Sequence, residues 1–161
     1  MRLPHVWLCC LWIALVATTP APAAAQALYG GAGLGPTILL DKPVGTKTTY
    51  WGISGVVGLE WPTPIGLRLE GTEVYGFLWL SADLTYRLAD RSRPLQPYAV
   101  AGAGFRIDVG NSDPIGTAGA GVRAKLSGPL SLFGEGRVHH VLSREPTRTF
   151  LFLTVGVLLT P

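Results

Sequence analysis

Charged residues in this sequence come in pairs that stand two or four positions apart, and this spacing restricts the fold more than any other feature. The pairs are Arg68 with Glu70, Asp83 with Arg87, Arg106 with Asp108, Arg123 with Lys125, and Glu135 with Arg137. Successive side chains of a β-strand point to opposite faces, so each pair lies on one face. Such agreement in all five pairs has a chance of about one in 32 if each pair is treated as a coin toss. The pattern predicts strands with one charged and one apolar face.

Turn-forming residues divide the chain into eight such segments. Clusters rich in Pro, Gly, Asp and Ser stand between them, for example Pro62–Pro64, Gly110–Pro114 and Ser127–Pro129. The predicted strands are Leu28–Leu39, Tyr50–Trp61, Gly66–Thr72, Phe77–Leu88, Pro97–Asp108, Gly116–Leu126, Leu130–Val141 and Arg148–Leu159. No segment keeps a helical period, so the sequence predicts an all-β barrel or sandwich.

The N-terminus predicts a cleavable signal peptide over residues 1–27. Arg2 precedes the apolar run Val6–Val16, and Ala21–Ala27 is rich in small residues. Cleavage after Ala25 or after Ala27 fits, and we expect Ala27. Both cysteines leave with this segment, so the mature chain has neither disulfide nor thiolate. We therefore expect one exported domain, residues 28–161.

Composition narrows the class of protein further. The 134 residues left from 161 carry 12 basic and 10 acidic side chains, because Arg2 is lost, and this balance argues against nucleic-acid binding. The mean hydropathy is positive at +0.34, yet no run after the signal approaches 18 apolar residues. A closed barrel in the outer membrane fits an exported, hydrophobic chain of this kind. A soluble periplasmic barrel, with its apolar faces lining the lumen around a hydrophobic ligand, is the alternative.

Aromatic residues favour the membrane alternative. Trp51 and Trp61 share an apolar face ten residues apart. At ~3.3 Å per residue and a tilt near 40° they would be separated by ~25 Å in height, which is the height of an outer-membrane apolar band. We predict Trp51, Trp61 and Tyr86 as interfacial aromatics.

Several stretches resemble a known family of membrane proteins. They are Leu28–Gly35, Gly55–Glu60, Pro97–Phe105, Gly119–Arg123 and Leu130–Arg137. In order and spacing they resemble the small outer-membrane β-barrel family of Gram-negative bacteria, the OmpA-like and OmpX-like barrels often labelled porin-family proteins. The resemblance implies an eight-stranded antiparallel up-and-down transmembrane barrel in outer-membrane lipid. It also implies a monomer inserted by the barrel-assembly machinery. Such barrels usually end on an aromatic residue, whereas this chain ends Val157–Pro161.

If the charged faces point inward, they form a network of nearly balanced charge in the lumen. The predicted members are Glu60, Arg68, Glu70, Asp83, Arg87, Arg106, Asp108, Arg123, Lys125, Glu135, Arg137 and His139. An eight-stranded barrel is just wide enough for side chains to fill. Unpaired buried charge is costly, so we expect paired charges and no large channel. A narrow ion path is the rival interpretation.

The segment Gly119–Ala124 matches the relaxed G-x-G-x-x-G/A pattern of a dinucleotide loop. That loop requires a helix to begin at its end, whereas here an alternating stretch runs into the turn Ser127–Pro129. We interpret the segment as a strand whose inward glycines make room for long neighbouring side chains. Glu135 and Asp108 are the expected partners of Arg123 and Lys125.

Two histidines raise the question of chemistry. His139 and His140 fall on opposite faces of a strand, so they are poorly placed to share a metal. Lipid A deacylases on this scaffold use a His–Ser pair, and the only serine near His139 is Ser143. We expect a structural or narrow-permeability role, with no catalytic residue, cofactor or metal. An outer-membrane enzyme or a surface-binding barrel is the alternative.

Overall fold

Eight antiparallel strands form the whole of the described molecule. The computed structural model describes residues 27–41, 48–143 and 148–160. The strands are β1 (Ala27–Leu39), β2 (Thr49–Glu60), β3 (Ile65–Val74), β4 (Phe77–Arg87), β5 (Leu95–Asp108), β6 (Asn111–Lys125), β7 (Leu130–Val141) and β8 (Arg148–Leu159). Apart from Ala27, the predicted signal peptide lies outside these residues.

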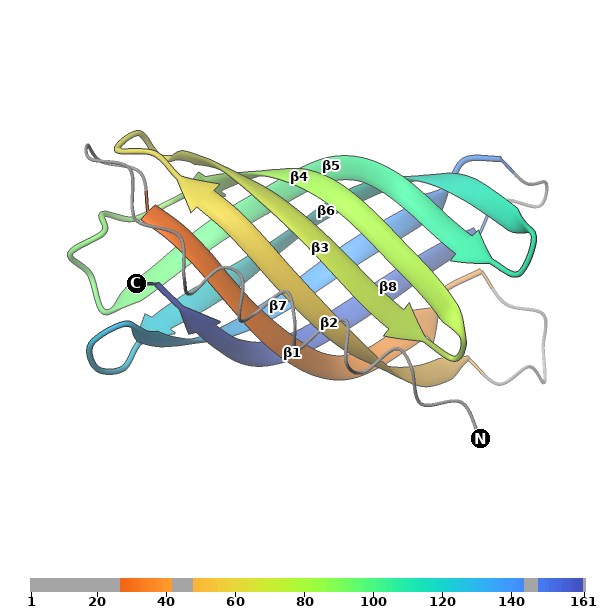
Figure 1. Cartoon of the computed structure of the whole chain (residues 1–161), viewed down its shortest axis with the longest axis horizontal. Coiled ribbons are helices and arrows are strands. Elements are labelled where there is room, and N and C mark those ends of the chain that lie inside the picture. Colours follow the sequence, from red (N-terminus) through yellow and green to blue (C-terminus); the bar gives the residue numbers. More distant parts are fainter. Residues whose placement is uncertain (1–26, 42–47, 144–147, 161) are drawn as a thin grey trace.

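Each strand pairs with the next one in the chain, and β1 pairs with β8, so the sheet closes into a barrel (Figure 1). The closing register runs from Gly30 opposite Leu159 to Leu39 opposite Phe150. It is interrupted beside Pro36, which has no N–H to donate. The predicted eight-stranded antiparallel up-and-down barrel is confirmed.

The two ends of the barrel differ in their turns. At the end where β1 begins and β8 ends, the proximal end, β4 and β5 are joined across residues 88–94 (left in Figure 1). At the opposite, distal end, two-residue turns join β3 to β4 at Tyr75–Gly76 and β5 to β6 at Val109–Gly110. Tyr75 and Gly76 both have positive φ, 51° and 85°, as tight hairpins of right-handed twist require.

The β5–β6 turn corrects one sequence prediction. Gly110–Pro114 was predicted as a turn because of its Asn, Ser, Asp and Pro residues. In the structure β6 already begins at Asn111, and Gly110, with φ 80°, makes the reversal. The chain needs only one residue of positive φ here, so the following polar residues are free to pair with β5. Asp113 therefore lies on a strand and not in a loop.

The barrel is inverted relative to a soluble protein. Exposed large apolar side chains cover its outer surface, among them Trp51, Leu69 and Val155, which are 70%, 54% and 62% exposed. Buried arginine and carboxylate side chains occupy the lumen between two small apolar clusters. The distal cluster contains Val74, Trp79, Ile115, Val141 and Phe152, and the proximal cluster contains Tyr29, Val56, Phe133 and Leu158.

Candidate functional site

The centre of the lumen holds two arginines surrounded by three carboxylates. Arg68 from β3 donates to Glu135 of β7 at 2.5 Å and also contacts Glu70. Arg137 from β7 donates to Glu135 at 2.5 Å, to Glu70 at 2.6 Å and to Asp83 of β4 at 3.0 Å. All five side chains are buried. These contacts link β3, β4 and β7 across the lumen.

Neutral hydrogen-bond donors complete this central network. Tyr98 from β5 donates to Glu135 at 2.8 Å, and Thr72 donates to Glu70 at 3.0 Å. Ser81 donates to Asp83 at 2.8 Å, and Thr117 of β6 donates to the other oxygen of Asp83. Buried carboxylates are costly unless their lone pairs are satisfied. Here each of the three accepts from at least one arginine and at least one hydroxyl group.

Inward-facing glycines give the long side chains their space. A Cβ atom built on Gly121 would lie 2.6 Å from the Tyr98 hydroxyl, whereas one built on Gly119 would first meet the β7 backbone, at the Gly136 carbonyl oxygen and the Arg137 Cα atom. Gly119 is paired with Arg137 on the neighbouring strand. The segment lies within β6, and Gly121 makes room for a long side chain as predicted, while Gly119 allows close approach of the β7 backbone.

A separate ion pair lies towards the distal end. Arg106 of β5 donates to Asp113 of β6 at 2.7 Å, and Ser143 donates to the other Asp113 oxygen at 2.7 Å. The Arg106 guanidinium also lies 5.3 Å from the ring centre of Phe77. Asp108, which was predicted on the same inward face as Arg106, is only half-buried, and its carboxylate accepts from the backbone N–H of Val109. Asp108 is the last residue of β5, and its carboxylate contacts the adjoining turn and not the buried charges of the lumen.

The proximal end contains the remaining predicted charges. Arg123 of β6 donates to Glu60 of β2 at 2.5 Å, across the lumen, and not to Glu135 or Asp108 as expected. Arg87 of β4 donates to the carbonyl oxygens of Trp61 and Thr63.

Lys125 does not belong to the interior. It is exposed and donates to the Arg91 carbonyl at 2.7 Å. It is the last residue of β6, where the strand leaves the lumen. Strand alternation therefore no longer places its side chain in the interior.

The interfacial aromatics lie in two environments. Trp51 and Tyr86 are on the outer surface, 70% and 50% exposed. Trp61 is half-buried, just beyond the end of β2, and its carbonyl accepts from Arg91 at 2.6 Å. Their position at a membrane interface stays a prediction.

The two histidines are separated, as strand alternation requires. The His139 ring lies 4.2 Å from the centre of the Phe152 ring and makes an edge contact with Trp79. His140 shares a 3.1 Å hydrogen bond with Thr149. Ser143, the nearest candidate for a His–Ser pair, contacts Asp113 instead. Within the described ranges, no group of three or more His, Cys, Asp or Glu side chains could hold a metal ion.

No helix among the described residues is long and apolar enough to cross a membrane.

Comparison with solved structures finds the same architecture. Neisserial surface protein A has a TM-score of 0.66 and 13% identity, over 88% of this chain and 100% of that one. The N-terminal β-barrel domain of Pseudomonas aeruginosa OprF has a TM-score of 0.61 and 15% identity, over 84% and 100%. A de novo designed transmembrane β-barrel gives 0.51 and 17%, over 89% and 100%.

Comparisons with models of known protein families and with curated proteins find no match. The structural likenesses define the class of fold, an eight-stranded barrel of the kind found in small outer-membrane proteins. The predicted resemblance is confirmed at the level of the fold.

Proposed function

We propose that this chain is an integral outer-membrane β-barrel protein of a Gram-negative-type bacterium, with a structural or narrow-permeability role. One observation carries the proposal, namely the inversion of polarity. Arg137 and Asp83 are 2% and 1% exposed in the lumen, whereas Leu84 on the same barrel is 60% exposed on the outer surface. A lipid-facing surface accounts for this distribution, and water on the outer surface does not. Outer-membrane lipid and the barrel-assembly machinery are the proposed partners, and the proposed state is a monomer.

The soluble alternative requires the opposite arrangement. A periplasmic barrel that carries a hydrophobic ligand needs apolar side chains along its lumen. The buried side chains of this lumen include Glu70, Arg106 and Glu135. Heat-modifiable gel mobility after detergent extraction tests the membrane assignment. Recovery of the mature protein in the aqueous fraction without detergent would contradict it.

The filled lumen supports a barrel without a large channel. The central network links strands from both sides of the lumen, and apolar clusters lie on both sides of it. Planar-bilayer recordings of the purified protein test this part of the proposal. We expect no steady pores of nanosiemens scale, and such pores would show that the interior is open.

The enzyme and surface-binding alternatives receive less support. In the described part of the chain, the Nδ1 atom of His139 has no hydrogen-bond partner, so no acid orients the ring through that atom. Two of the connections at the distal end, Tyr75–Gly76 and Val109–Gly110, are too short to present a broad binding surface. Alanine at His139 and Ser143 should leave lipid A composition unchanged, and an altered lipid A would favour the enzyme alternative.

A further inference from the structure

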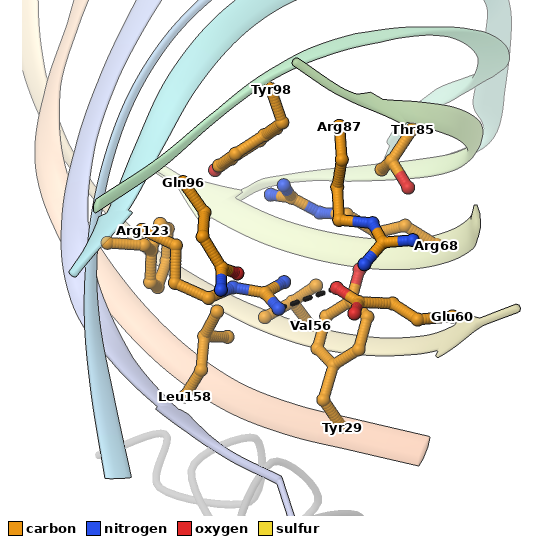
Figure 2. Close-up of a pocket in the computed structure, with 11 residues that line it drawn as sticks. Tyr29, Val56, Glu60, Arg68, Thr85, Arg87, Gln96, Tyr98, Arg123 and Leu158 are labelled. Carbon is orange, nitrogen blue, oxygen red and sulfur yellow. Dashed lines mark hydrogen bonds and ion pairs between the residues drawn. The ribbon is translucent and has the colours of Figure 1, made fainter. Parts of the chain in front are cut away.

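A hollow at the proximal end contains more positive charge than its carboxylate can neutralise. The hollow is small, with a cavity volume of about 10 Å³, and it is partly open to solvent. Its polar lining includes Glu60, Thr85, Arg87, Gln96 and Arg123. Figure 2 shows the guanidinium groups of Arg87 and Arg123 extending from different strands towards Glu60. The hollow borders the central network, because Arg68 and Tyr98 also line it.

Glu60 is already shared between two cations. It pairs with Arg123 at 2.5 Å and with Arg91 at 3.7 Å. Within the described ranges, no carboxylate lies within ion-pair distance of Arg87. Its Nη2 atom donates to two backbone carbonyls, while its Nη1 atom is buried without a partner. The Nε atoms of Arg91 and Arg123 are likewise buried and unpaired.

The β4–β5 turn beside this hollow, residues 88–94, is held by hydrogen bonds and adds further positive charge. Gln96, which is 3% exposed, donates to the carbonyls of Arg91 at 2.7 Å and Arg93 at 3.2 Å. Lys125 donates to the same Arg91 carbonyl. The charged residues that line the hollow are Glu60, Arg68, Arg87 and Arg123, and the adjoining turn and strand end add Asp90, Arg91, Arg93 and Lys125. Hydrogen-bond donors without acceptors, held by a rigid scaffold, are a preorganised site for an anion.

We propose that the proximal mouth binds a small oxyanion of phosphate type, with Arg87 and Arg123 as its principal ligands. A guanidinium presents planar N–H donors that match the oxygens of a phosphate. An oxyanion at the mouth would balance the positive charge that Glu60 leaves uncompensated. Either inorganic phosphate or the phosphate of a lipid headgroup at the barrel rim could supply this chemistry.

The test uses the full mature chain, folded in a maltoside detergent and phosphate-free buffer, with ¹⁵N-labelled arginine. Inorganic phosphate is titrated at constant ionic strength while the guanidinium NMR signals of Arg87 and Arg123 are followed. We expect saturable shifts with half-saturation on the order of 1 mM, as for a solvent-open site with few ligands. Transfer to phosphatidylglycerol nanodiscs without free phosphate provides the second arm. Shifts only in that arm identify a headgroup as the source.

Matched variants separate a site from general attraction. Arg87→Gln should weaken phosphate binding about tenfold, the effect of losing one charge-assisted contact. Arg148→Gln removes the same charge at the distal end of β8 and should change the affinity less than twofold. Arg87→Lys keeps the charge but loses the planar guanidinium, and its phosphate affinity should lie between those of the other two variants. Absence of saturable shifts in both arms overturns the proposal, as does equal weakening by Arg87→Gln and Arg148→Gln. Because wild-type protein supplies the first readout, misfolding of a variant does not decide the outcome.

Discussion

Arg106 and Asp113 are directly paired across the β5–β6 hairpin, and Nη2 of Arg106 donates to Oδ2 of Asp113 at 2.7 Å. Their side chains are 5% and 7% exposed. The pair brings opposite charges together within one hairpin, seven residues apart in sequence. Because β5 and β6 extend up to the two-residue turn, the ion pair lies inside the barrel wall and not in a loop.

Asp113→Asn should destabilise the barrel by about 3 kcal/mol, because it leaves the Arg106 guanidinium buried beside a neutral group. Urea unfolding in lipid vesicles, followed by the shift between folded and unfolded gel mobility, measures the change. Asp108→Asn is the matched control, because Asp108 lies on the same hairpin and, among the described residues, its carboxylate accepts from one backbone N–H. Its expected effect is within about 0.5 kcal/mol. A larger loss for Asp108→Asn than for Asp113→Asn would contradict this assignment.

The hairpin also shows how far the sequence could predict the fold. The inward face of Arg106 followed from alternation along its own strand, which does not depend on its neighbours. The partner did not follow, because Asn111–Pro114 has the composition of a turn and only the backbone geometry at Gly110 shows otherwise. Pro114 is tolerated because it lies near the distal end of β6, where a lost N–H costs least.

Contacts between side chains on opposite sides of the lumen could not be predicted from the sequence, for a different reason. Arg123 pairs with Glu60, 63 residues away, although both lie on strands whose inward faces were predicted. Which inward side chains meet depends on strand tilt and stagger around the closed sheet. Strand alternation predicts which face of the sheet a side chain occupies, but not its height along the barrel axis. For the same reason, alternation could not predict that β6 leaves the lumen at Lys125.

Gly121→Ala should destabilise the barrel by about 1–3 kcal/mol, the usual range for overpacking. The added Cβ would lie 2.6 Å from the Tyr98 hydroxyl and displace it from Glu135. Gly116→Ala is the control, because a Cβ there would meet nothing within 4 Å. It should leave the urea midpoint within about 0.5 kcal/mol of wild type. Equal effects of the two substitutions would show that Gly121 is not needed for space.

Arg137→Met should cost about 3–5 kcal/mol, because Asp83 loses its only ion-pair partner among the described residues. Adding Asp83→Asn removes the uncompensated charge and should restore roughly 0.5–3 kcal/mol relative to Arg137→Met alone. A double-mutant cycle on urea unfolding provides both values. Simple additivity of the two substitutions would mean that Arg137 and Asp83 are not coupled, contrary to their 3.0 Å contact.

Leu69→Arg tests whether lipid covers the outer surface. Leu69 lies in the middle of β3, paired with Ala82 of β4, and is 54% exposed. An exposed leucine of a soluble protein tolerates arginine with a change within about 0.5 kcal/mol. At the centre of a bilayer the same substitution costs about 2–4 kcal/mol. We expect the larger loss in lipid vesicles, measured by urea unfolding. Ser92→Arg, in the exposed β4–β5 turn, is the control and should be nearly neutral. If the two variants unfold at the same urea concentration, the outer surface of β3 does not face a bilayer.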